Sequence, residues 1–216
     1  LLETGNFGNE NSDNIRKKYQ KAIEKEGVVS YAKGKAKEVI AQNPQTFTAN
    51  YENAYQTHAS MEPLSCVVKV ENNKCEVWAP TQSPGWAFGR VARALKIPAK
   101  NITFHITPSG GGFGRRLIPD FVVEAALVAQ KVGKPVKMMW TREDDIQHGF
   151  YHPFQHHQHT MAFDAKNNPV AWNYKLVSPF HTATFNPRFT ELTKKHHGSI
   201  YPPANPYDLA NILKTW

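Results

Sequence analysis

The stretch from residue 74 to residue 141 constrains the fold most, because short β-rich runs alternate there with helical patterns. The β-rich runs are KCEVWAP, NITFHITP and PVKMMWT, and the helical patterns begin at Pro84 and Pro119. Ser83 is placed to cap the first helix and Gly133 to end the second. A strand–helix–strand–helix–strand series pairs by default in parallel, with right-handed crossovers. The sequence therefore predicts a mixed α+β fold with this series as its core.

Further strands are expected on both sides of this core. TFTANYE and SCVVKVE precede it, and HTMAFDAKNNPVAWNYKLVS follows it as two strands around an Asn-Asn-Pro turn. Residues 1–45 are interpreted as a peripheral or connecting segment with two helices, the first ended by Gly27 and the second stopped by Pro44. Residues 46–216 are expected to form one lobe.

Composition and charge exclude several classes of function. The chain has 216 residues, 40% of them hydrophobic, with a formal net charge of +8, which is typical of a globular protein. No apolar run approaches the roughly 20 residues of a membrane-spanning helix. The basic residues form small groups such as Arg115–Arg116, which we expect on solvated faces, and no nucleic-acid motif accompanies them. Neither nucleic-acid binding nor a membrane span is expected.

The first residues lack both an initiator Met and the layout of a secretory signal. We therefore interpret the chain as a piece of a longer polypeptide. The compartment stays open between cytoplasm and periplasm.

Cysteine, histidine and acidic residues offer no strong metal site. Cys66 and Cys75 lie on two strands whose turn would set them too far apart for a disulfide, so both are expected to be core thiols. The histidines of YHPFQHHQH could form a metal cluster, but they alternate between strand faces without an acidic or thiol partner. They are expected at the surface or an interface, as are His196–His197. The TREDD stretch is expected to cap a helix rather than to bind a cation.

Two strand-to-helix junctions carry the candidate site. APTQSPG and SGGGFGRR would lie at the same sheet edge, where ligands of such sheets bind. Free N–H groups at helix starts favour anionic or electron-rich ligands, and glycines let the backbone approach them closely. Gln82 is the amide donor of the first junction.

Known phosphate-binding loops do not match the second junction. A dinucleotide fingerprint would need a glycine where Arg115 stands, and a P-loop would need Gly-Lys-Ser/Thr. The residues indicate a backbone-lined ligand site built from two loops. On the glycines alone, a purely structural turn is the alternative.

Several stretches together resemble the molybdenum hydroxylases, the xanthine dehydrogenase and aldehyde oxidase family. The similar stretches are THASMEP, WAPTQSP, GGGFGRR, DFVVEA, PVKMMWTREDDIQHGFYHP and NPYDLANILKTW. They follow the family's order from Tyr51 to Trp216. The likeness is to the large, molybdenum-binding subunit of the bacterial branch typified by isoquinoline 1-oxidoreductase β subunit. It implies that the chain is the first lobe of the molybdenum cofactor-binding domain.

The resemblance also implies roles for residues. Gln82 would donate its amide toward the apical oxygen of molybdenum, and Phe113 would fill space beside the metal and its dithiolene. The implied cofactor-binding residues are Gln82, Gly110, Gly111, Gly112, Phe113, Gly114 and Arg115. None of them would ligate the metal directly. The HxxMEP-like stretch from His58 to Pro63 is expected to be an architectural strand, with a Glu62 hydrogen bond near the site.

The implied activity is hydroxylation of an N-heteroaromatic or aldehyde carbon with oxygen from water. The cofactor would be molybdopterin, in its cytosine dinucleotide form. Electrons would leave to a small iron–sulfur partner subunit with two [2Fe–2S] clusters. The general-base glutamate would lie in a Gly-x-Gly-Glu motif, which this chain does not contain, so the remainder of the large subunit would be required and the fragment alone would be inactive.

Substrate class and an alternative function complete these expectations. Arg116 and Leu117 stand where the xanthine-oxidising branch has an active-site glutamate, so a purine anchored in that way is not expected. The alternative is a non-catalytic anion-binding or assembly module that uses the same glycine loop.

Overall fold

The computed structural model describes residues 10–179, 209 and 211–215. They form a mixed α/β chain, as predicted, and fall into two compact units. Unit 1 combines residues 1–55 with residues 153–216, and unit 2 comprises residues 56–152. The predicted boundary lay at residue 45 instead, and the assignment of residues 46–216 to one cofactor-binding lobe stays a prediction.

Unit 2 contains the predicted alternating series. Its elements are β4 Ser65–Glu71, β5 Lys74–Ala79, α3 Pro84–Leu95, β6 Ile102–Ile106, α4 Asp120–Val132 and β7 Val136–Met139. Short pieces complete the unit: β3 Gln56–Thr57, η2 Ala99–Asn101, η3 Arg115–Leu117, α5 Arg142–Gln147 and β8 Tyr151–His152. The caps that end α3 and α4 are Lys96 and Gly133, both in the left-handed conformation. Ser83 is the N-cap of α3, but its side chain makes no capping hydrogen bond.

The four-stranded sheet of unit 2 has the order β6-β5-β4-β7. β5 and β6 are parallel, as predicted, but β7 pairs antiparallel with β4 and not with another strand of the series. The reason is the tight hairpin between β4 and β5, where Asn72 and Asn73 both have positive φ, the geometry favoured in two-residue turns. This hairpin occupies one edge of β5, β6 takes the other, and β7 joins the free edge of β4.

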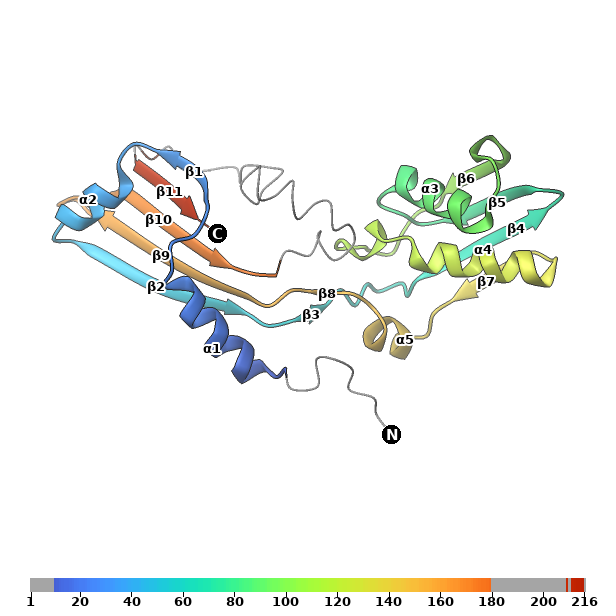
Figure 1. Cartoon of the computed structure of the whole chain (residues 1–216), viewed down its shortest axis with the longest axis horizontal. Helices are drawn as coiled ribbons and strands as arrows, with labels where there is room; N and C mark the ends of the chain where they lie inside the picture. The colour runs from blue at the N-terminus through green and yellow to red at the C-terminus, as the bar shows by residue number, and fades with distance from the viewer. Residues whose placement is uncertain (1–9, 180–208, 210, 216) are drawn as a thin grey trace. The chain divides into compact units, whose positions relative to one another are not determined.

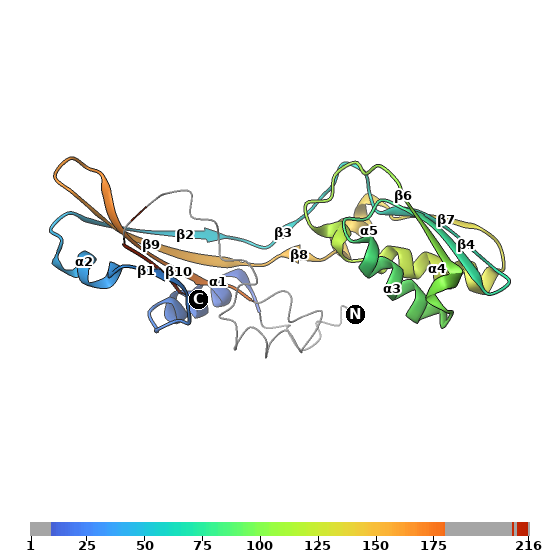
Figure 2. The same cartoon turned by 90° about the horizontal axis from the view of Figure 1, so that it is seen from above.

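The core of unit 2 lies between the sheet and its two long helices. α3 and α4 lie side by side on one face of the sheet (Figures 1 and 2). Alternate strand residues point into this core, among them the free thiols Cys66 and Cys75. Cys75 lies opposite Val70 in the hairpin register, so the predicted spacing of the two cysteines is confirmed.

The segments of the candidate site lie at one end of the strands of this sheet. β5, β6 and β7 run in the same direction, because β4 is antiparallel to both β5 and β7. Their carboxyl ends therefore lie at the end of the sheet where β4 begins. Two hydrogen bonds extend the sheet there, from Thr107 N to Ala79 O (3.3 Å) and from Trp140 N to Leu64 O (2.9 Å).

Unit 1 is a five-stranded sheet with the order β1-β11-β10-β9-β2. Its elements are α1 Ser12–Ile23, β1 Val29–Lys33, α2 Ala36–Gln42, β2 Thr46–Asn53, β9 Gln155–Phe163, β10 Pro169–Val177 and β11 Asn211–Thr215. The two predicted helices and the strands β2, β9 and β10 are confirmed, but α1 ends at Ile23 with Glu24 as its C-cap, so the predicted end at Gly27 is wrong. The sequence did not predict β1 or β11, which pair with each other.

The histidine-rich stretch lies on β9, where the expected surface position is wrong for one residue. His156 is buried, with its Nδ1 3.3 Å from Glu52 Oε1. His157 and His159 are partly buried, and both stack on Tyr174 of β10. His196–His197 lie outside the described residues.

The described residues hold no group of three or more His, Cys, Asp or Glu residues placed to bind a metal ion. They also hold no helix with the length and apolar character to cross a membrane.

Phe121 on α4 tests the core of unit 2. Its side chain is fully buried, so Phe121→Ala should lower the free energy of unfolding by about 3–5 kcal/mol through lost burial and a cavity. Leu127 on the same helix is 45% exposed, and Leu127→Ala should cost no more than about 0.5 kcal/mol. Chemical denaturation of both variants measures the difference, and equal losses would contradict this core.

Candidate functional site

The two junctions predicted to share a site do meet. Gly114 N donates to Gln82 Oε1 at 3.1 Å, and Arg116 O accepts hydrogen bonds from Gln82 N and Thr81 Oγ1, each at 3.1 Å. The bend around Gln82 follows β5, and the glycine loop follows β6. Because β5 and β6 are parallel neighbours, the two bends emerge side by side and their main chains can bond directly.

Two glycines of the loop are required by close approach. A Cβ on Gly112 would lie 2.5 Å from Gln82 Oε1, and a Cβ on Gly110 would lie 2.6 Å from Glu62 Cβ. Two others are required by backbone conformation, since Gly111 and Gly114 have φ of 98° and 99°, a region that side chains rarely adopt. Gly112 does not share this conformation. A side chain there would instead displace the Gln82 carboxamide.

Several hydrogen-bond donors of the two bends remain available. Because Gln82 Oε1 accepts from Gly114 N, the carboxamide is oriented so that its NH₂ group points away from this bond. Within the described part of the chain, neither this NH₂ group nor the N–H groups of Gly112 and Phe113 have a hydrogen-bond partner. Such a set of uncharged donors fits an electron-rich oxygen or sulfur group. The predicted donor role of Gln82 is thus sterically possible.

The stretch around Glu62 supports the loop from behind, but it is not the expected strand. Residues 58–63 are irregular, with Ala59 at a φ of 40°. Glu62 Oε2 accepts from Gly110 N at 2.7 Å, and Gly110 O accepts from Glu62 N at 3.2 Å. The expected Glu62 hydrogen bond near the site is therefore present.

The expectation that Arg115–Arg116 lies on a solvated face is wrong. Arg115 is 2% exposed and binds both carboxylate oxygens of Asp120, at 2.9 and 2.7 Å. Its guanidinium also lies over the rings of Trp140 and Phe150. The Arg115 side chain is thus committed inside the protein, so any contact of this residue with a ligand would come from its main chain.

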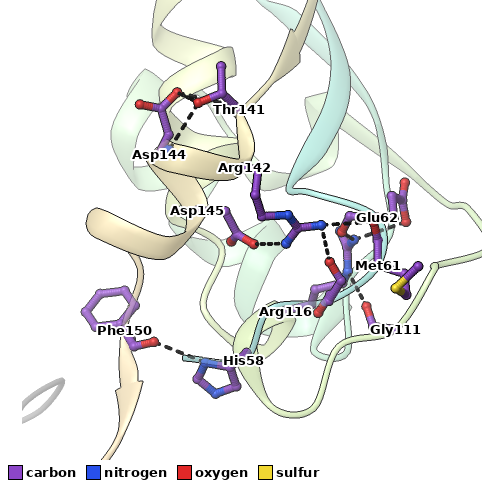
Figure 3. Close-up of polar contacts among 11 residues, drawn as sticks. His58, Met61, Glu62, Gly111, Arg116, Thr141, Arg142, Asp144, Asp145 and Phe150 are labelled. Carbon is purple, nitrogen blue, oxygen red and sulfur yellow. Dashed lines mark hydrogen bonds and ion pairs between the residues drawn. The ribbon is translucent and has the colours of Figure 1, made fainter. Parts of the chain in front are cut away.

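Arg116 is fully buried and faces the same interior. Its Nε donates to Gly111 O at 2.7 Å, and its Nη2 donates to Glu62 O at 2.8 Å and to Glu62 Oε2 at 3.0 Å (Figure 3). Burial lowers the pKa of Arg116. Of Arg116 and Leu117, which follow the loop, only Leu117 is exposed.

A third arginine ties the Glu62 stretch to α5. Arg142 donates to Ser60 O at 2.6 Å and to Met61 O at 3.0 Å, and it pairs with the buried Asp145 at 3.0 Å (Figure 3). Thr141 caps this helix in a capping box with Asp144. The predicted capping role of TREDD is confirmed.

His58 lies against the other side of the glycine loop. Its Nδ1 is 3.1 Å from Phe150 O, and its ring centre is 4.2 Å from that of His152. A Cβ on Gly114 would lie 3.7 Å from His58 Nε2. Burial, together with the neighbouring His152, lowers the pKa of His58.

Comparison with known proteins identifies the family of this chain. The family model described as molybdopterin cofactor-binding domain matches residues 18–212. The chain belongs to the molybdopterin cofactor-binding domain family. The expected resemblance to this family is therefore confirmed.

Relatives of this molybdopterin-binding chain are oxidoreductases by name. Isoquinoline 1-oxidoreductase subunit beta of Brevundimonas diminuta is 39% identical over 104 residues, covering 48% of this chain and 13% of the relative. Xanthine dehydrogenase of Emericella nidulans is 28% identical over 166 residues, covering 74% of this chain and 12% of the relative. The chain thus spans only a small part of the length of these two proteins.

A solved structure supports the molybdopterin-binding fold. The aldehyde oxidoreductase from Desulfovibrio gigas superimposes with a TM-score of 0.66 at 17% sequence identity, covering 88% of this chain and 20% of that one. At this identity the likeness concerns the fold alone. It agrees with the mixed α/β architecture described above.

The sequence did not reveal the buried arginines of this molybdopterin-binding chain. Arg115 and Arg116 were expected on solvated faces, and the acceptors of Arg116 include main-chain carbonyls that no sequence pattern marks. One signal was available: two adjacent arginines directly after a glycine-rich loop and directly before a helix that is apolar almost all round. Such a position leaves little surface for two charges.

His58 predicts a pH dependence of stability. Because its pKa is lowered in the folded state, the unfolded chain takes up a proton first as the pH falls below the ordinary value of about 6.5. Folding stability should therefore decrease from pH 7.5 to pH 5.5. His58→Asn, which keeps a donor for Phe150 O, should make this decrease smaller in thermal unfolding curves. An equal decrease in variant and parent would show that His58 does not contribute.

Proposed function

We propose that this chain binds the molybdopterin cofactor of a molybdenum hydroxylase through the Gln82 bend and the glycine loop. The observation that supports the proposal is the meeting of these two bends, with no partner among the described residues for the Gln82 NH₂ group or for the N–H groups of Gly112 and Phe113. Membership of the molybdopterin cofactor-binding domain family supplies the identity of the ligand. Residues 46–216 would then form the first lobe of the binding domain.

Each site residue has a separate task in this proposal. Gln82 donates from its NH₂ group to an oxygen of the cofactor, and Gly114 N keeps the amide in that orientation. Gly110, Gly111 and Gly112 bring the loop main chain within contact distance. Phe113, whose side chain is 66% exposed, covers the ligand from the solvent side.

The reaction that we propose for the whole protein is hydroxylation of an N-heteroaromatic or aldehyde carbon. When bound, the molybdenum cofactor supplies the two-electron oxidation and the transfer of water-derived oxygen. The residues of this chain hold and orient that group and exclude water from it. The general base, the grip on a cytosine dinucleotide tail and the iron–sulfur partner with its [2Fe–2S] clusters come from outside this chain.

Side chains around the loop favour an uncharged substrate. Arg116, at a position next to the loop, points into the protein, whereas Phe113 and Leu117 are exposed and apolar. No charged side chain of the loop itself is therefore presented to anchor a purine. A flat aromatic ring or an aldehyde with an apolar substituent fits these surroundings.

The donor role of Gln82 is tested by two replacements. In the full-length protein, Gln82→Ala and Gln82→Glu should each lower turnover by about 10²-fold, because a preorganised donor at the reacting group is lost. Gln82→Glu keeps an acceptor for Gly114 N, so its thermal midpoint should stay close to that of the parent. Gln130→Ala on α4, which removes a hydrogen bond to Leu95 O, serves as the control. Unchanged turnover in both Gln82 variants would remove this residue from its role.

Cofactor retention tests the glycine loop. Gly112→Val should abolish molybdenum retention, because its side chain would displace the Gln82 carboxamide. Gly89→Val adds the same side chain on α3, where no atom lies within 4 Å, and should leave the molybdenum content unchanged. Elemental analysis of the full-length proteins measures both. A parent without molybdenum that binds phosphate at the loop would instead support the anion-binding module.

A further inference from the structure

We propose that Arg116 is a positioning residue that, together with Glu62, sets the direction of the ligand-facing donors by fastening the glycine loop to both neighbouring segments. The coupling between segments follows from the contacts of this chain. Its consequence for molybdopterin binding rests on the proposed function.

The side chain of Arg116 holds two of the three segments. It donates to Gly111 O at 2.7 Å within the glycine loop, and to Glu62 O and Glu62 Oε2 at 2.8 and 3.0 Å in the supporting stretch (Figure 3). A guanidinium presents its N–H groups in a rigid planar fork. The three acceptors are therefore held in one fixed geometry, which a lysine with a single flexible ammonium cannot reproduce.

The main chain of Arg116 holds the third segment. Its carbonyl oxygen accepts from Gln82 N and from Thr81 Oγ1, each at 3.1 Å. Arg116 thus bonds to the Gln82 bend, the glycine loop and the Glu62 stretch at once. A shift of this residue would move the Gln82 carboxamide relative to the loop.

Glu62 and Gln82 fix opposite ends of the same loop. Glu62 Oε2 accepts from Gly110 N, and Gln82 Oε1 accepts from Gly114 N. Arg116 bonds to Glu62 and to the Gln82 bend, so it links the two ends through the protein interior. The free N–H groups of Gly112 and Phe113 lie between these fixed points.

The energetics favour a geometric role over a contribution to stability. Arg116 is fully buried, and its Nη1 has no hydrogen-bond partner among the residues that the structure describes, which disfavours the folded state. Buried ion pairs add little net stability because desolvation offsets their attraction. An apolar side chain could fill this interior without that cost, but it could not bond to the glycine loop and the Glu62 stretch.

Residue-resolved hydrogen–deuterium exchange in the full-length protein tests the coupling. Glu62→Gln and Arg116→Lys should each raise the exchange rate of Gly114 N–H by about tenfold, although neither changed side chain bonds to Gly114. The sheet amides of β4 and β5 should keep their protection. Glu124→Gln, which alters a carboxylate bonded to Trp140 Nε1, is the matched control and should leave the loop unchanged.

Two exchange results would overturn the proposal. One is faster exchange at Gly110 N–H alone in Glu62→Gln, with Gly114 N–H unchanged in both variants. The other is faster exchange throughout β4 and β5, which would show that the pair supports the unit in general. If Arg116→Lys does not fold, Glu62→Gln, which is the milder change, decides the question.

Molybdenum content of the same preparations separates this inference from the proposed function. A parent protein without molybdenum would contradict the proposed function, while the exchange of Gly114 N–H would still decide the coupling. With a loaded parent, a loosened loop accompanied by loss of molybdenum supports the positioning role. A loosened loop with full molybdenum content would overturn it.

Discussion

The common direction of β5, β6 and β7 is the constraint on which the site depends. Parallel pairing of β5 with β6, and the insertion of β4 between β5 and β7, bring four chain segments to one sheet edge. Segments that follow neighbouring parallel strands start side by side, so they can contact each other without long loops. The Gln82 bend and the glycine loop can then bond through their main chains, which fixes them more tightly than contacts between long side chains would.

Polar groups in this site are divided between an inner and an outer side. On the inner side, the buried Arg115 and Arg116 and the partly buried Arg142 bind carboxylates and carbonyl groups. On the outer side, the free groups are uncharged amide donors. In the proposed function, charge would build the scaffold, and the ligand would meet uncharged donors.

Sequence patterns predicted where the helices and strands lie better than they predicted which strands pair. The hydrophobic alternation and the caps located α3, α4 and the strands between them, because those signals are local. The position of β7 beside β4 and the parallel pairing of β11 with β10 depend on contacts between distant segments. Likewise, the resemblance located Gln82 and the glycines, but the burial of Arg116 depends on main-chain carbonyls that have no signature in the sequence.

The hydrogen bond from Gly114 N to Gln82 Oε1 joins a main-chain atom to the amide that faces the ligand. Exchanges of the side chains at Phe113 and Leu117 leave that bond intact. Under the proposed function, substrate preference would therefore change through these two side chains without loss of the bond that orients the carboxamide.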